Sequence, residues 1–107
     1  MSKALREPTE YGNTYTWQNV TQTDTPEAVQ VAPGKYAINV EGTFGGMSVE
    51  IKAGRSLGEE HSLSGGDGAV FIENNTLIAT LGSSFVLPVL TGGANANVDI
   101  SLSPIPN

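Results

Sequence analysis

The sequence contains no cysteine, one histidine and only five lysine or arginine residues in a chain of 107. Without cysteine, the fold can hold neither disulfides nor thiolate metal sites. The basic residues do not cluster and the formal net charge is −6, so the chain would repel phosphate groups rather than neutralise them. No apolar run approaches the roughly 20 residues that a membrane-spanning helix needs. We therefore predict a protein that binds neither nucleic acid nor a membrane.

Groups suited to catalysis are also scarce. The single histidine, His61, lies in a serine-rich segment with no recognisable nucleophile motif around it. Glu59 and Glu60 are adjacent, so an extended backbone would point their carboxylates to opposite faces. The sequence has no zinc-ligand spacing, and no phosphate-binding fingerprint surrounds its glycine pairs. We predict that the chain is not an enzyme and uses no metal or other cofactor.

Strand periodicity is clearest in residues 34–53, where apolar residues recur at every second position. A two-residue turn at Gly45 and Gly46 would close a hairpin there, because such turns favour residues that adopt positive φ. The predicted hairpin pairs Phe44 with Met47, and it buries the face that carries Tyr36, Ile38, Val40, Phe44, Met47, Val49, Ile51 and Ala53. It also places Glu41 opposite Glu50. We interpret that pair as part of a solvated face, with a shared cation or a basic partner as the alternative.

Two further hairpins are predicted in the second half of the chain. One has Asn74 and Asn75 at its turn, between residues 69–73 and 76–81. The other has Gly92 and Gly93 at its turn, between strands 84–91 and 94–103. In that hairpin one face carries Phe85, Leu87, Val89, Ala96, Val98 and Ile100. Because Pro88 cannot donate to a ladder, we expect its strand at an edge or a bulge.

These strands predict the fold class. Residues 14–20 and 28–31 add two more strands, and no stretch shows the 3.6-residue period with caps, so we expect essentially no helix. About eight short strands separated by Gly and Pro turns are typical of an all-β, two-sheet antiparallel sandwich, with the jelly roll as one candidate topology. We assign residues 14–105 to this domain and residues 106–107 to a C-terminal tail.

Residues 1–13 are polar and have no periodic apolar pattern, so we expect an N-terminal arm without a core of its own. Two interpretations are open: a frayed terminus, or an arm that becomes ordered on a partner. Under the second interpretation the partner-binding residues are Lys3, Leu5, Arg6 and Tyr11. The first strand then carries Tyr15 and Trp17 on one side, and the only tryptophan of a small sandwich is more often a core residue than a ligand platform.

Two parts of the chain resemble small β-sandwich proteins encoded by tailed bacteriophages. Residues 33–36 (PGKY) and 40–51 (VEGTFGGMSVEI) resemble the core of these proteins. Residues 85–88 (FVLP), followed by Gly92, Gly93 and VDISLSPI at 98–105, are similar to their C-terminal part. The resemblance covers residues 29–105. It departs at Val89 and Leu90, where a small residue and glycine are expected, and residues 1–13 have no counterpart.

The resemblance implies a structural component of the virion, commonly a head decoration or minor capsid protein, with no catalytic residues. We therefore predict a decoration protein on the capsid surface that binds the major capsid protein through the arm and one sheet edge. The N-terminus lacks the hydrophobic centre of a secretory signal, so assembly in the host cytoplasm is expected. A homotrimer or another homo-oligomer would suit the axes of a capsid lattice.

Two alternatives remain at this point. The first is a carbohydrate-binding or adhesin module of a phage fibre or of a polysaccharide-active protein, in which Tyr11, Tyr15 and Trp17 form the sugar platform. A buried Trp17 would count against that function. The second is a tail or neck component, which the sequence does not distinguish from a head protein.

Overall fold

The computed structural model describes residues 3–10, 12–54, 61–62, 70–81 and 84–105. Within these ranges every helix or strand is a β-strand, which confirms the predicted all-β class. The ten strands are β1 (Ala4–Thr9), β2 (Gly12–Val20), β3 (Val29–Val31), β4 (Gly34–Thr43), β5 (Ser48–Gly54), β6 (His61–Ser62), β7 (Val70–Phe71), β8 (Asn75–Leu81), β9 (Ser84–Thr91) and β10 (Asn97–Ile105).

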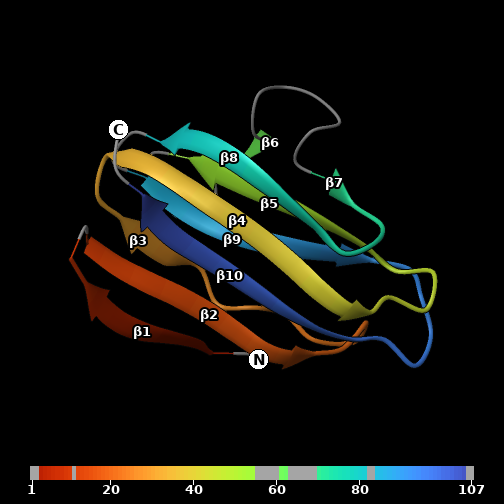
Figure 1. The fold of residues 1–107 in the computed structure, drawn as a ribbon. Helices are drawn as coiled ribbons and strands as arrows, with labels where there is room; N and C mark the ends of the chain where they lie inside the picture. The colour runs from red at the N-terminus through yellow and green to blue at the C-terminus, as the bar shows by residue number, and fades with distance from the viewer. Residues whose placement is uncertain (1–2, 11, 55–60, 63–69, 82–83, 106–107) are drawn as a thin grey trace.

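The strands form two antiparallel sheets packed face to face, as Figure 1 shows. Sheet A has five strands in the order β1-β2-β10-β4-β8. Sheet B has the order β3-β9-β5-β6, and β7 also pairs with β5. The two-sheet antiparallel sandwich is therefore confirmed.

The chain pairs with itself as one long antiparallel ribbon. Strand β2 pairs with β10, β3 with β9, β4 with β8, and β5 with the two short strands β6 and β7. Successive pairs of this ribbon lie alternately in sheet A and sheet B. That arrangement is the jelly-roll topology, with β6 and β7 together in the place of one strand. Strand β1 is an additional edge strand beside β2.

The three predicted hairpins are wrong, because each proposed pair of strands is divided between the two sheets. Strands β4 and β5 lie in different sheets, and so do β7 and β8, and β9 and β10. The turn at Gly45 and Gly46 does form: both residues have positive φ, and Met47 N donates to Phe44 O at 2.9 Å. Beyond that turn the two strands separate and face each other across the core. Alternation predicts which face of a strand is buried, but not which strand pairs with it.

The buried faces of β4, β5 and β10 are the predicted ones, whereas that of β9 is not. In β9 the side chains of Val86 and Pro88 are buried, and those of Phe85, Leu87 and Val89 are only partly buried on the opposite face. The error follows from the predicted turn at Gly92 and Gly93, because the real connection runs from residue 92 to residue 96 and does not keep the two-residue register.

Strand β9, which carries Pro88, is not an edge strand as a whole, because it lies between β3 and β5. Strand β3 pairs with only the first three residues of β9, Ser84, Phe85 and Val86. On that side of β9, Pro88 therefore has no strand partner that would need its missing N–H group.

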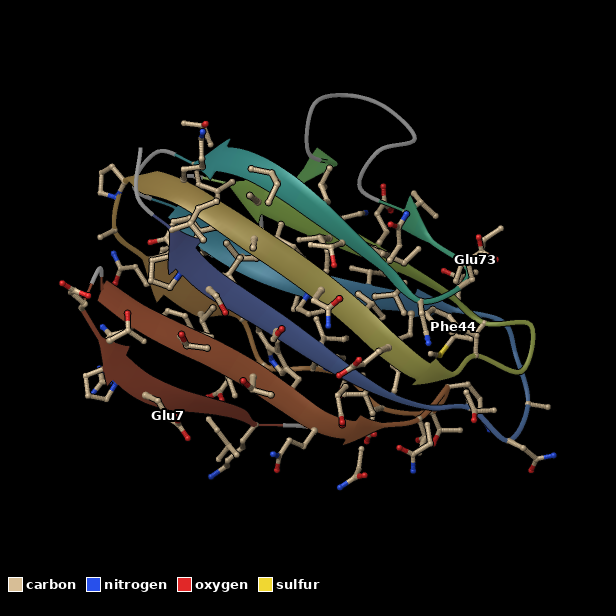
Figure 2. The ribbon with its side chains drawn as sticks, viewed as in Figure 1. Glu7, Phe44 and Glu73 are labelled. Carbon is tan, nitrogen blue, oxygen red and sulfur yellow. The ribbon has the colours of Figure 1, made fainter. Side chains whose placement is uncertain are left out.

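The core fills the space between the sheets. Its buried hydrophobic residues are Trp17, Val20, Val29, Val31, Tyr36, Ile38, Val40, Phe44, Met47, Val49, Ile51, Phe71, Leu81, Val86, Ala96, Val98, Ile100 and Leu102. Strands β4, β5, β8, β9 and β10 present alternate residues to this core, whereas in β2 the buried residues Trp17 and Val20 are three apart because the register with β10 shifts there. Figure 2 places Phe44 at one end of this core, with Glu73 nearby at the surface.

Glu41 and Glu50 do not form the predicted pair, because they lie in different sheets. Glu41 is opposite Asp99 of β10, and Glu50 lies 3.9 Å from Lys52 Nζ. The carboxylate of Asp99 accepts a hydrogen bond from Asn19 N at 2.9 Å. Asn19 has a φ of 53°, and the register between β2 and β10 shifts at this point, so the side chain of Asp99 satisfies a bulged backbone.

Residues 4–9 are not an arm but the edge strand β1. All six residues pair with β2, from Ala4 opposite Trp17 to Thr9 opposite Gly12. The prediction failed because a solvated edge strand needs no apolar alternation, so its sequence resembles that of a polar tail. Strand β2 likewise begins at Gly12, two residues before the predicted strand.

The two turns at one end of the sandwich pack directly against each other. Ala94 N donates a hydrogen bond to Gly45 O at 2.9 Å. A Cβ atom added at Gly45 would overlap Ala94 O, and one at Gly93 would lie 2.5 Å from Met47 Cβ. By contrast, a Cβ at Gly46 would find its nearest neighbour, Gly93 Cα, at 4.0 Å. The approach of the two turns thus requires glycine at Gly45 and Gly93, but not at Gly46.

We predict that Gly45→Ala destabilises the fold more than Gly46→Ala. Both residues have positive φ, so either alanine carries a backbone strain of about 1–2 kcal/mol. Only Gly45→Ala adds an overlap with the backbone of the second turn, for about 1–3 kcal/mol more. Urea denaturation of the two variants checks the difference. Equal free energies of unfolding would show that the contact between the turns is unimportant.

Candidate functional site

The predicted partner-binding residues lie on or beside β1 at the margin of sheet A. Lys3 and Arg6 are exposed, and Leu5 is 50% exposed. Tyr11 lies outside the described residues. Figure 2 shows Glu7 of the same strand at the margin of the molecule, on the side away from Phe44 and Glu73. Because Leu5 and Glu7 are two residues apart in a strand, their side chains share the outer face of the sheet.

The backbone of this edge offers few hydrogen bonds to another strand. Pro8 has no N–H, so its pair with Asn13 is of the non-hydrogen-bonded kind, and alternation makes the pairs of Ala4 and Arg6 the same kind. The N–H groups of Ala4 and Arg6 therefore point away from β2. Glu27 Oε2 already accepts from Ala4 N at 2.8 Å. Arg6 is left as the one residue of β1 with a free outward N–H among those described.

Glu27 fixes β1 and Trp17 at the same time. Its backbone oxygen accepts a hydrogen bond from Trp17 Nε1 at 2.8 Å, while its carboxylate binds Ala4 N. Trp17 is 1% exposed. The indole is therefore a core residue with its polar group satisfied, as the sequence favoured, and it cannot stack on a sugar in this structure.

Glu27 was not among the predicted residues, because its contacts are not local. Its partners lie 10 and 23 residues away along the chain. In the sequence it stands in a Thr-Pro-Glu turn, and nothing in that pattern indicates a long-range contact. Only the packing of the segment before β3 under β2 brings the three residues together.

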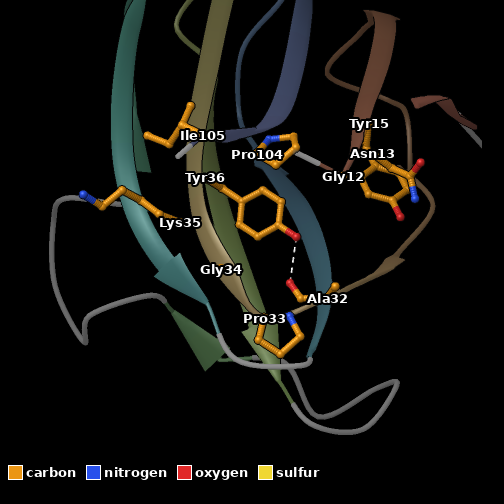
Figure 3. Close-up of a pocket in the computed structure, with 10 residues that line it drawn as sticks. All are labelled: Gly12, Asn13, Tyr15, Ala32, Pro33, Gly34, Lys35, Tyr36, Pro104 and Ile105. Carbon is orange, nitrogen blue, oxygen red and sulfur yellow. Dashed lines mark hydrogen bonds between the residues drawn. The ribbon is translucent and has the colours of Figure 1, made fainter. Parts of the chain in front are cut away.

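A cavity of about 410 Å³ opens at the end of the sandwich where β2, β4 and β10 meet the turn before β4. It is lined by Gly12, Asn13, Tyr15, Ala32, Pro33, Gly34, Lys35, Tyr36, Pro104 and Ile105. Figure 3 shows Tyr36 on β4 and Tyr15 on β2, with Pro104 between them. The lining combines two phenols, an amide and an ammonium group, and has no carboxylate or imidazole.

Both phenols of the cavity donate to backbone oxygens of the segment from residue 30 to residue 32. Tyr36 Oη donates to Ala32 O at 2.7 Å, as the dashed line in Figure 3 marks, and Tyr15 Oη donates to Gln30 O at 3.1 Å. Burial raises the pKa of Tyr36, and the nearby Tyr15 raises it further. The two tyrosines thus tie β3 and the following turn to sheet A, so their first role is structural.

Other candidate groups are not brought together. Within the described ranges no cluster of three or more His, Asp or Glu side chains could hold a metal ion. Glu59 and Glu60 lie outside these ranges, and His61 is described only as part of β6, opposite Ala53. The described residues also include no helix of a length and apolarity that would cross a membrane.

Comparison with protein-family models, with curated proteins and with solved structures finds no match for this chain. The candidate site has three parts: the exposed surface of β1, its attachment through Glu27, and the tyrosine-lined cavity.

We predict that Tyr36→Phe weakens the dependence of stability on pH in alkaline solution. Because the pKa of Tyr36 in the folded state is raised above its ordinary value of 10.0, the unfolded chain loses the phenol proton first as the pH rises. The free energy of unfolding should therefore be unaffected by this group below pH 10 and should fall above it. Denaturation of both proteins at a series of pH values measures the difference.

At neutral pH the same variant should lose about 1 kcal/mol, because the hydrogen bond to Ala32 O is missing. Tyr15→Phe is the matched control for a phenol in the same cavity. An identical alkaline decline in the native protein and in Tyr36→Phe would contradict the assigned cause.

Proposed function

We propose that the chain is a non-enzymatic structural protein of a bacteriophage virion, a decoration protein that binds the major capsid protein. The observation that carries this proposal is the surface of β1. It presents the half-exposed Leu5 between charged residues, at one edge of sheet A. The predicted arm and the predicted sheet edge are thus one feature, and the proposed contact uses both.

The chemistry of β1 favours contact through side chains. Its backbone edge is largely blocked by Pro8 and by the hydrogen bond from Ala4 to Glu27. Leu5 supplies exposed apolar area, and the neighbouring Lys3, Arg6 and Glu7 can form pairs with charges on a partner. Apolar contact inside a polar rim is the usual composition of a specific protein interface.

The resemblance of residues 33–51 and 85–105 to small phage sandwich proteins supports the proposal. The jelly-roll topology is compatible with it, since viral capsid proteins use this fold. Lectin domains and cupins use the fold as well, so topology alone does not select the function. The selection rests on the sequence resemblance and on the surface of β1.

The burial of Trp17 counts against the carbohydrate-binding alternative. Of its three proposed aromatic residues, Trp17 is buried, Tyr11 lies outside the described residues, and Tyr15 is engaged with Gln30 O. A sugar platform needs an exposed ring face, and Trp17 does not provide one. A tail or neck component remains the second alternative, and the position of the chain in the particle would distinguish it from a head protein.

The proposal predicts that Leu5→Asp weakens binding to capsids that lack this chain. Removing the apolar contact and adding a buried charge should raise the dissociation constant by about tenfold or more. Cosedimentation of purified protein with such capsids measures the binding. Ile72→Asp is the matched control, because Ile72 is 70% exposed and lies far along the chain, in the bend after β7.

Denatured virions should contain the chain in near-stoichiometric proportion to the major capsid protein on a gel. Absence of the chain from virions would refute the virion role. Equal binding by the native protein, Leu5→Asp and Ile72→Asp would leave the virion role intact but remove β1 as the contact.

A further inference from the structure

The second edge of sheet A, strand β8, differs from β1 in that neither a proline nor a charged side chain blocks it within the described residues. Strand β8 (NTLIATL) contains neither proline nor a charged residue, and it lies at the end of the strand order. Its Ile78 is 53% exposed on the outer face of the sheet. An uncharged edge strand of seven residues is a template for pairing with another strand.

Side-chain contacts near β8 show which of its backbone N–H and C=O groups point to the free edge of sheet A. Gly42 N donates to Asn74 Oδ1 at 2.9 Å, so the backbone groups of Gly42 on β4 point toward β8. By alternation the same holds for Val40 and Ile38, whose partners are Asn75 and Leu77.

The intervening residues of β8 must then direct their backbone groups to the free edge, and these are Thr76, Ile78 and Thr80. The contact of Thr76 agrees with this assignment. Its N–H donates to the side chain of Asn75 at 2.8 Å rather than to β4.

The sequence around Ile78 is symmetric in character. Leu77 and Ala79, on either side of Ile78, are both apolar, and their side chains face the core. The next residues, Thr76 and Thr80, are identical, and their side chains lie on the solvent-exposed face of the sheet. A second β8 strand laid antiparallel about a twofold axis at Ile78 would therefore place like with like. Ile78 would meet Ile78 of the second copy, and Thr76 would meet Thr80.

We propose that two copies of this chain associate through β8, in antiparallel register about Ile78, so that their A sheets become one continuous sheet. The outward N–H and C=O groups of Ile78 would exchange two hydrogen bonds with their equivalents across the axis. Thr76 and Thr80 would extend the ladder on both sides, with the Asn75 side chain releasing Thr76 N. Cross-strand Ile–Ile and Thr–Thr pairs are both favourable, and no charges meet.

A second copy of the chain can pair with β8 more readily than with β1. Twofold symmetry requires one surface to be complementary to itself, and Thr76 to Thr80 satisfies that requirement. On β1 an equivalent pairing would have to displace Glu27 from Ala4 N and would find no donor at Pro8. The inference concerns the isolated protein and does not rest on the proposed role in the virion, so the two can fail separately.

Sedimentation equilibrium of the full chain tests the proposal. We expect a concentration-dependent rise from the monomer mass of 11.1 kDa toward twice that value, because an interface of one edge strand is small. Ile78→Lys should raise the dimer dissociation constant by about tenfold or more, since two ammonium groups would meet on the axis. Leu5→Lys, at the blocked edge, is the matched control and should dimerise like the native protein.

Thr80→Pro separates backbone pairing from side-chain contact. It removes an N–H that faces the free edge and none that faces β4, so the monomer should keep its circular dichroism spectrum while the dimer is lost. Ala79→Pro would instead remove a hydrogen bond to β4 and should lower the melting temperature. If Thr80→Pro dimerises like the native protein, strand pairing through β8 is refuted.

A cysteine at Ile78 tests the register. The native chain has no cysteine, so Ile78→Cys carries a single thiol. Hydrogen-bonded partners in an antiparallel ladder have Cα atoms about 5.5 Å apart, within the range that a disulfide spans. Mild oxidation should therefore give a covalent dimer, whereas Leu5→Cys should give little. A native chain that is monomeric at all accessible concentrations, or equal crosslinking of both variants, would overturn the proposal.

Discussion

The contact between the turns at Gly45 and Gly93 constrains both sheets at once. The first turn joins β4 to β5 and the second joins β9 to β10, while β4 pairs with β10 and β5 pairs with β9. Two connections that cross between the same pair of sheets must lie one on the other. The glycines allow their backbones to meet, and the hydrogen bond from Ala94 N to Gly45 O fixes their relative position. That position aligns Gly42 with Val98 and Ser48 with Thr91.

Rolling one ribbon into two sheets leaves sheet A with two edges of opposite character. Strand β1 lies beside β2 and carries charges, a proline and the capping carboxylate of Glu27. Strand β8 lies beside β4 and carries none of these. Natural sheets commonly block their edges with charge or proline, so an edge without either is a place where pairing is tolerated or used. The asymmetry separates two surfaces of the molecule: in the contacts proposed above, side chains would recognise a partner at β1, and backbone groups would do so at β8.

Alternating hydrophobicity predicted the all-β class and the buried faces of β4, β5 and β10, because a strand with one buried face must repeat every two residues. It did not predict the partners. The turn residues Gly45 and Gly46 favour a tight turn equally well whether the strands then pair or separate. The choice depends on whether the apolar faces of β4 and β5 are better buried beside each other or against each other. With two sheets available, facing strands bury both faces completely, and that tertiary gain overrides the local hairpin preference.

The candidate surface was predicted for a different reason from the one that the structure supplies. Lys3, Leu5 and Arg6 were singled out as an arm that lacks a core, yet their position depends on the core. Trp17 is buried because its indole N–H finds Glu27 O, and the carboxylate of the same glutamate binds Ala4 N at the start of β1. An indole buried without that acceptor would leave an unpaired donor, so the tryptophan fixes where Glu27 lies. Glu27 in turn fixes where β1 begins. Through Glu27, the buried Trp17 thus holds the exposed Leu5 in place. An exposed Trp17 would instead have favoured a sugar-binding protein.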